Sequence, residues 1–327
     1  MLDFIIILLC AYSLAYAENK MVSYFQGATG YIGSSAVAKG EYCFYPGKYR
    51  VLTPWIIYFI GRINVLKNKS TYPSTILLQN CRMIVHPGTQ FNWISYSLLK
   101  FSLILGALIS MYVYLHTFTS IPILGVLLFA ILLPITFLFD YAECWTELIL
   151  LGFFMVGALS GWSIIILCSL TLLAALNRET TVLYPAIYWI YTNNLLFSIL
   201  IFIIFILGQL IPRVIYGFSS KKTVTSFRFK DNVRIIKQLF CGYHDKQGTF
   251  IKNIVYNNFN STVIYMSLLI AVFLIGWPTM SIINCQLYLL FIIFAGAISI
   301  PGSWSETRIY YPTLFVIVPT LTKLLTK

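Results

Sequence analysis

The sequence predicts an all-α fold, a polytopic transmembrane bundle of about eight to ten spans that includes short or re-entrant helices. Of the 327 residues, 59% are hydrophobic and 10% are charged, whereas an ordinary soluble domain carries about a quarter charged residues. Apolar runs of about 15 to 22 residues recur along the chain, and each is near the length that crosses a hydrocarbon layer. Because the backbone in lipid must satisfy its own hydrogen bonds, we expect these runs to be helices.

The N-terminal part of the chain is expected to hold one span and a long polar loop. Residues 1–17 form a first transmembrane helix or signal anchor, and we expect it to be retained because Asp3 stands where a cleaved signal peptide carries positive charge. Residues 18–93 form the loop. Within it, residues 51–66 are partly apolar and contain Trp55, which is typical of an interfacial or short re-entrant helix.

Residues 94–216 form the first group of transmembrane helices. Two short runs in this group, 145–159 and 162–176, are separated only by Ser160-Gly161, so they are predicted to form a helical hairpin. Short helices of this kind usually line a cavity or thin the bilayer locally. The other runs of the group are 94–115, 121–139, the marginal 181–191, and 195–216.

The C-terminal part begins with a basic loop, residues 217–262. Its Lys and Arg residues favour a cytoplasmic location, whereas the equally basic loop 18–93 is too long for the positive-inside rule to apply. Six intervening spans would place both loops on one side of the membrane, and five would place them on opposite sides. The last group of helices, residues 263–327, contains the apolar runs 263–283, 287–300 and 309–321, with breaks or kinks expected at Pro278, Pro301, Pro312 and Pro319.

The net charge of +12 indicates the partners of the chain. The Lys and Arg residues lie in two loops and not on a compact basic domain with interleaved aromatic residues, so no nucleic-acid partner is predicted. Membrane lipids with anionic headgroups, or a lipid substrate that carries phosphate, fit the charge better.

Three acidic residues lie before and within the first short run of the hairpin, at Asp140, Glu143 and Glu147. Glu143 and Glu147 are four residues apart and would share one helix face. Such carboxylates could bind a divalent metal or act as a general base. The alternative that we favour is a solvated helix start, where acidic residues complement the helix dipole. The need for a metal cofactor therefore stays open, and no metal ligand is assigned.

Two charged islands, NRET and SETR, each place one Glu and one Arg between apolar runs. Charges near membrane depth are expensive, so they are usually paired or functional. If they pair between helices, the pairs are Glu179 with Arg308 and Glu306 with Arg178. If they are functional, the two Arg side chains bind a phosphate while Glu179 or Glu306 acts as the base. Arg50 would be a third anion contact, or would extend to the interface as a surface residue.

The segments YRVLTPW, NRET and ETR, the last followed by two prolines, together resemble uncharacterised polytopic bacterial membrane proteins akin to the GT-C class of glycosyltransferases. Enzymes of that class take sugars from polyprenyl-phosphate carriers. The resemblance implies a catalytic carboxylate in the first extracytoplasmic loop, where this chain has Glu18 and Glu41 but no D-x-D or E-x-D pair. It makes Glu41 or Glu18 a candidate base, and Arg50, Arg178 and Arg308 the lipid-phosphate contacts.

Three functions are therefore considered. The first is a glycosyltransferase-like membrane enzyme that uses a polyprenyl-phosphate-linked sugar. The second is a transporter of a lipid or solute, with the Glu and Arg islands along its pathway. The third is a non-catalytic subunit of a membrane complex, in which the islands clamp helices together and the loops bind partner subunits. The sequence contains no Walker loop, G-x-S-x-G or H-E-x-x-H motif, so ATP use, triad hydrolysis and zinc proteolysis have no support.

Overall fold

The computed structural model describes residues 2–21, 50–62, 70–71, 76–78, 83–85, 90–91, 93–133, 142–216, 265–299 and 311–326. These residues are almost entirely helical, as predicted, and the strands among them are two or three residues long. The chain divides into two compact units. Unit 1 comprises Met1–Tyr114 and Phe139–Val224, and unit 2 comprises Leu115–Leu138 and Thr225–Lys327. The predicted basic loop, residues 217–262, lies outside the described residues.

The centre of unit 1 is a hairpin of two helices, α6 (Ala142–Leu159) and α7 (Ile164–Asn177). The predicted hairpin is confirmed. Its turn uses Gly161 in the left-handed region at φ +69°, which a residue without a Cβ adopts at little cost. The Ser163 side chain then caps α7 by accepting a hydrogen bond from the backbone N–H of Ile165.

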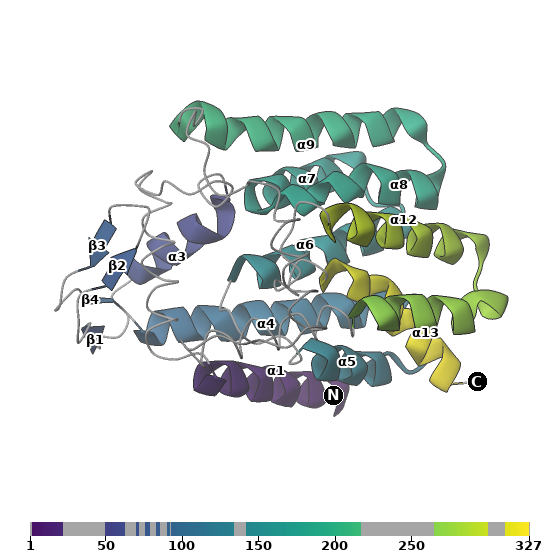
Figure 1. Cartoon of the computed structure of the whole chain (residues 1–327), viewed down its shortest axis with the longest axis horizontal. Helices are drawn as coiled ribbons and strands as arrows, with labels where there is room; N and C mark the ends of the chain where they lie inside the picture. Colours follow the sequence, from purple (N-terminus) through teal and green to yellow (C-terminus); the bar gives the residue numbers. More distant parts are fainter. Residues whose placement is uncertain are drawn as a thin grey trace, which may run out of the picture. The chain divides into compact units, whose positions relative to one another are not determined.

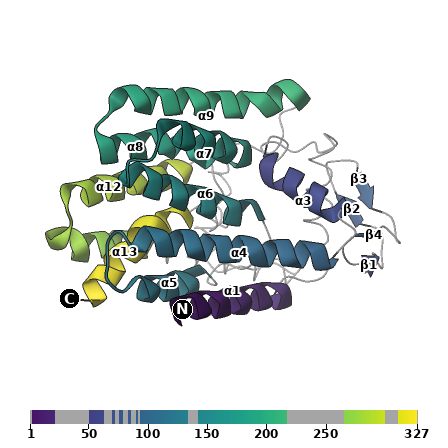
Figure 2. The same ribbon diagram turned by 180° about the vertical axis from the view of Figure 1, so that it is seen from behind.

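Two further helices complete this antiparallel series. After a 3₁₀ turn, η3 (Glu179–Leu183), the chain forms α8 (Tyr184–Thr192) and α9 (Leu195–Tyr216). The predicted run 195–216 is therefore confirmed as one helix, which lies alongside α7 (Figures 1 and 2). The contact is close, since a Cβ built on Gly208 of α9 would lie 2.6 Å from the Cβ of Ala175 in α7.

The other helices of unit 1 are α1 (Leu2–Met21), α3 (Leu52–Arg62) and α4 (Trp93–Leu115). The hydroxyl of Tyr112 in α4 donates to Asp3 of α1 over 2.7 Å. The α3 helix confirms that the partly apolar segment after Arg50 is helical. Two antiparallel strand pairs lie between α3 and α4 in sequence: β1 (Ser70–Thr71) with β4 (Gln90–Phe91), and β2 (Ile76–Leu78) with β3 (Met83–Val85).

Unit 2 contains α5 (Pro122–Leu132), a helix over Tyr265–Thr279, α12 (Ile282–Ser299) and α13 (Leu314–Leu325). The break expected at Pro278 within the run 263–283 is confirmed, because the helix tightens there into the 3₁₀ helix η4 (Trp277–Thr279). The end of the run is wrong, since α12 begins at Ile282. Within the unit, α5 packs against α13, and a Cβ on Gly125 would lie 2.7 Å from the Thr322 hydroxyl.

Two described helices are long and apolar enough to cross a membrane, Ser97–Leu115 within α4 and Leu195–Tyr216, which is α9. The other apolar helices in the described ranges are shorter, at 10 to 17 residues. Length and composition therefore give weak support for membrane association. The count of eight to ten spans stays a prediction.

Candidate functional site

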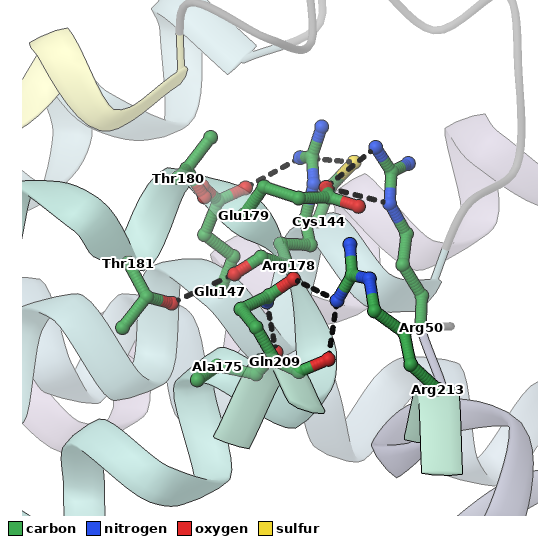
Figure 3. Close-up of polar contacts among 10 residues, drawn as sticks. All are labelled: Arg50, Cys144, Glu147, Ala175, Arg178, Glu179, Thr180, Thr181, Gln209 and Arg213. Carbon is green, nitrogen blue, oxygen red and sulfur yellow. Dashed lines mark hydrogen bonds and ion pairs between the residues drawn. The ribbon is translucent and has the colours of Figure 1, made fainter. Parts of the chain in front are cut away.

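A group of polar side chains of unit 1 meets where α6 begins and α7 ends. Arg50, the first turn of α3, η3 and the last turns of α9 also contribute to it. Figure 3 shows most of the side chains concerned. We call them the polar cluster, which consists of Arg50, Thr53, Glu147, Asn177, Arg178, Glu179, Thr180, Gln209 and Arg213.

The inner of the two ion pairs in the cluster joins Glu147 of α6 to Arg178, the residue that follows α7. Nη1 of Arg178 lies 2.5 Å from Oε2 of Glu147, and the two side chains are 3% and 6% exposed. The Thr180 hydroxyl donates to the other carboxylate oxygen, and the same guanidinium nitrogen lies 3.4 Å from the Cys144 sulfur. A charge this deeply buried needs such partners. The expectation of a solvated helix start is therefore wrong for Glu147.

A second ion pair joins Arg50 to Glu179 at the edge of the cluster. Nε and Nη2 of Arg50 donate to the same oxygen of Glu179, over 3.1 and 2.9 Å. These side chains keep 26% and 34% of their surface exposed. Burial would raise the pKa of Glu179, but the charge of Arg50, hydrogen bonds to the carboxylate and the charge of Arg178 outweigh it, so the pKa lies below its usual value.

The C-terminal carbonyl groups of α7 find partners in other elements. The last carbonyls of a helix have no partner within it. The carbonyl of Ala175 accepts a hydrogen bond from the Gln209 side chain over 2.5 Å, and that of Leu176 accepts from the backbone N–H of Val51 over 2.8 Å. Both α9 and the segment before α3 are therefore hydrogen-bonded to the end of α7.

Buried hydroxyl groups extend the cluster from α7 to α3 and α6. The Thr53 hydroxyl, in the first turn of α3, lies 2.7 Å from the side-chain oxygen of Asn177 and 2.8 Å from the Thr146 hydroxyl. Thr53 and Asn177 are at most 1% exposed. A buried polar group without a partner is destabilising, so this chain of contacts specifies how the three helices meet.

The end of α9 adds a third guanidinium and the aromatic side chain of Tyr216. Arg213 donates to the backbone oxygen of Gln209 and, over 3.0 Å, to its side-chain oxygen. Close by in sequence, the Tyr216 hydroxyl accepts a hydrogen bond from the indole N–H of Trp55 over 3.0 Å. The predicted interfacial segment, α3, is thus hydrogen-bonded to the end of α9.

The structure brings together three of the six residues that the sequence assigned to a site: Arg50, Arg178 and Glu179. The other three, Glu41, Glu306 and Arg308, lie outside the described residues, and so do Asp140 and the side chains of Glu18 and Glu143. The pairing expected between the two islands involves Glu306 and Arg308, so it stays a prediction, and the structure shows partners for Arg178 and Glu179 among the described residues. Those partners are Glu147 and Arg50, both in unit 1.

Sequence reasoning missed Thr53, Gln209 and Arg213. A signal for the last two was present, since both are polar residues inside an otherwise apolar run of 22 residues. Polar side chains in such a run usually face protein or a site. Thr53 carries no comparable signal, because threonine is common at helix starts.

The described residues contain no group of three or more His, Cys, Asp or Glu side chains that could hold a metal ion. The Glu147 carboxylate is already engaged by Arg178 and Thr180. Comparison of the chain with protein-family models, with curated protein sequences and with solved structures finds no match in any of the three.

Proposed function

We propose that the protein is a multi-pass helical membrane protein that binds the phosphate of a membrane lipid at the polar cluster, and that it transfers a sugar from a polyprenyl-phosphate carrier. The observation that carries the proposal is the position of the cluster. Three guanidinium groups and two carboxylates of unit 1 gather at one end of α9, which is long and apolar enough to cross a bilayer.

The surface of α9 supports a membrane location. At about 1.5 Å per residue, its 22 residues span about 33 Å, near the thickness of a hydrocarbon core. Only 22% of the residues in its most apolar 18-residue stretch are buried within the protein. The core helix of a soluble protein would be mostly buried, whereas a helix that faces lipid exposes apolar side chains. Large exposed side chains of this helix include Leu196, Ile199, Phe202, Ile203, Leu207, Val214 and Ile215.

The aromatic residues at the cluster end support a headgroup level there. Trp and Tyr are enriched where hydrocarbon meets water. Trp55 and Tyr216 contact each other at the end of α9. On this placement Arg50 and Arg213 are at the depth where lipid phosphates are found, and each is only partly buried.

The chemistry of Arg50 supports an anionic ligand. Its Nε and Nη2 lie along one edge of the guanidinium group, and the side chain keeps 26% of its surface exposed at the edge of the cluster. The planar guanidinium suits bidentate contacts to phosphate oxygens. A phosphate at the rim could therefore contact this edge.

The transfer step would use this phosphate contact. A hydroxyl of the acceptor attacks the anomeric carbon of the sugar, and the bond from that carbon to the carrier's phosphate oxygen breaks. The electron pair leaves with the lipid phosphate, which Arg50 stabilises. The hydroxyl proton passes to a carboxylate, for which Glu179 is the described candidate and Glu41 and Glu306 are the candidates from the sequence.

The proposal is tested by reconstituting the purified protein in phosphatidylcholine vesicles with and without a polyprenyl phosphate. Binding of the phosphate lipid should weaken about tenfold or more in Arg50→Gln, since a charge-assisted contact is lost. Lys323→Gln is the matched control, because it removes an exposed positive charge at the end of α13. Equal binding by the wild type, Arg50→Gln and Lys323→Gln would refute the lipid-phosphate site.

A second function, a non-catalytic subunit of a membrane complex, is favoured by one observation. The Arg178–Glu147 pair is neutralised and buried, as expected of a clamp between α6 and the end of α7. In that case Arg50→Gln would leave the size of the native complex unchanged, and Glu147→Gln would release the partner subunits. Size analysis of the detergent-extracted protein distinguishes the two functions.

A further inference from the structure

We infer that Glu179 is an internal substitute for the ligand phosphate: it occupies Arg50 when no ligand is bound and is displaced when a phosphate headgroup arrives. This inference rests on the proposed function, because it concerns the same lipid-phosphate site. It adds that the site is closed by its own carboxylate until the ligand binds. The residues that carry it are shown in Figure 3.

The first argument is the geometry of the Arg50 contact. Nε and Nη2 form one edge of the guanidinium, and both donate to a single oxygen of Glu179, Oε2. This edge is the one that binds two oxygens of a phosphate side by side. A phosphate would thus replace one shared acceptor by two separate ones, so the exchange costs Arg50 no hydrogen bond.

The second argument is that Arg50 stays in position without Glu179. Its neighbour Val51 is fully buried and donates its backbone N–H to the carbonyl of Leu176. Two residues further on, Thr53 is buried and hydrogen-bonded to Asn177. The backbone that presents Arg50 is therefore fixed to the end of α7, so release of the carboxylate leaves the Arg50 side chain attached beside the site, within reach of the ligand.

The third argument is the contrast with the inner pair. Arg178 and Glu147 are 3% and 6% exposed, and Thr180 also binds the Glu147 carboxylate. Separating them would break a deeply buried ion pair, which is strongly unfavourable. Arg50 and Glu179 are 26% and 34% exposed, and ion pairs that solvent can reach contribute little to stability. Only the outer pair can exchange readily.

The exchange has a chemical consequence. With Arg50 bound to phosphate, Glu179 loses the positive charge that lowers its pKa, and it becomes a better proton acceptor beside the ligand. The base would then be uncovered only when the phosphate lipid is present. This coupling would prevent the carboxylate from acting on other hydroxyl groups.

The test compares binding by the full chain in phosphatidylcholine vesicles that contain a polyprenyl phosphate. Glu179→Gln and Glu179→Ala should both bind the lipid about 2- to 5-fold more tightly than the wild type, because the competing carboxylate is gone. Arg50→Gln should lose binding. Asp3→Asn is the control, since it removes a carboxylate elsewhere in unit 1 and should leave the affinity unchanged.

Inorganic phosphate added to the same vesicles identifies the source of the ligand. If inorganic phosphate competes with the lipid, and competes better in Glu179→Gln, the site recognises the phosphate group itself. If the gain in affinity is seen only with the lipid, the ligand is the headgroup of a membrane lipid. Both results support the displacement of Glu179.

The two levels of the proposal fail separately. If Arg50→Gln loses binding but both Glu179 variants bind no more tightly than the wild type, the displacement is refuted and the phosphate site stands. If the wild type and every variant fail to bind the phosphate lipid, the proposed function is refuted, and the displacement with it.

Discussion

The two ends of α7 are completed in different ways. At its N-terminus, Ser163 caps the helix from the adjacent turn, and the turn residues are exposed. At its C-terminus, the carbonyls of Ala175 and Leu176 are completed by Gln209 of α9 and by the backbone of Val51. One end uses local residues and solvent, and the other uses residues distant in sequence.

The difference shows where the protein is rigid. A helix end that water can reach needs little from the rest of the protein. A buried helix end must have its polar groups satisfied internally, because an unsatisfied group in a low-dielectric interior is costly. The two ion pairs follow the same division, since the Arg178–Glu147 pair is buried and the Arg50–Glu179 pair is partly exposed. Substitutions at the buried end should therefore have larger effects than substitutions at the exposed end.

The largest effect is expected for Glu147→Gln. It removes one charged partner of a buried ion pair, so the free energy of unfolding in detergent should fall by about 3–5 kcal/mol. Glu179→Gln, at the rim, should change it by less than about 1 kcal/mol. Replacing both members of the inner pair, in Glu147→Leu with Arg178→Met, should recover much of the loss. Similar losses for Glu147→Gln and Glu179→Gln would contradict the distinction between the two pairs.

The second prediction concerns the carbonyl of Ala175. Gln209→Met keeps the volume of the side chain but removes the donor to that carbonyl and an acceptor for Arg213. The free energy of unfolding should fall by about 1–3 kcal/mol, the range for a buried group left unsatisfied. Gln286→Met in α12 is the control, because that side chain is exposed. Denaturant titration of both variants measures the difference, and an equal change in each would show that the helix end does not depend on Gln209.

The helices themselves could be predicted from the sequence because their signals are local. Length and apolar composition predicted the run 195–216, and the Ser160-Gly161 turn predicted the hairpin. Pro278 likewise predicted a break inside the run 263–283, because proline ends the helical hydrogen bonding, and the helix does end there in a 3₁₀ turn. The bound at residue 283 was wrong, since apolar composition alone does not show that α12 begins at Ile282.

The partners of the charged residues could not be predicted, since they depend on which helices become neighbours. Glu147 lies near a helix start, where a solvated acidic residue is common, but the return of α7 beside α6 places Arg178 next to it. Likewise, Glu179 and Arg50 are separated by 129 residues, and no pattern in the sequence joins them. One expectation about these charges was correct, namely that they would have partners or a function. It follows from the cost of placing a charge in an apolar environment.

The third prediction uses the close approach of α9 to α7. In Gly208→Ala the new Cβ would lie 2.6 Å from the Cβ of Ala175 and 3.3 Å from the Leu172 carbonyl oxygen. Neither atom belongs to a flexible side-chain end, so the helices must separate, at a cost of about 1–3 kcal/mol that the better helix propensity of alanine offsets by about 1 kcal/mol. Gly296→Ala in α12 is the control, since nothing lies within 4 Å of its Cβ. It should be neutral or stabilising in the same thermal unfolding experiment, and a Gly208→Ala variant as stable as Gly296→Ala would contradict the close contact.

The smallest effect is expected at the exposed end of α7. Ser163→Ala removes the cap on the backbone N–H of Ile165, and loss of an N-cap typically lowers stability by about 0.5–2 kcal/mol. Because Ser163 is exposed and the hydrogen bond is 3.3 Å long, we expect the lower part of that range. Ser169→Ala is the matched control, since that exposed hydroxyl only donates to the carbonyl of Ile165 within the helix. Phosphate-lipid binding should be unchanged in both variants, because the exposed turn and the polar cluster lie at opposite ends of α7. A loss of binding in Ser163→Ala would mean that the two ends are coupled through the helix.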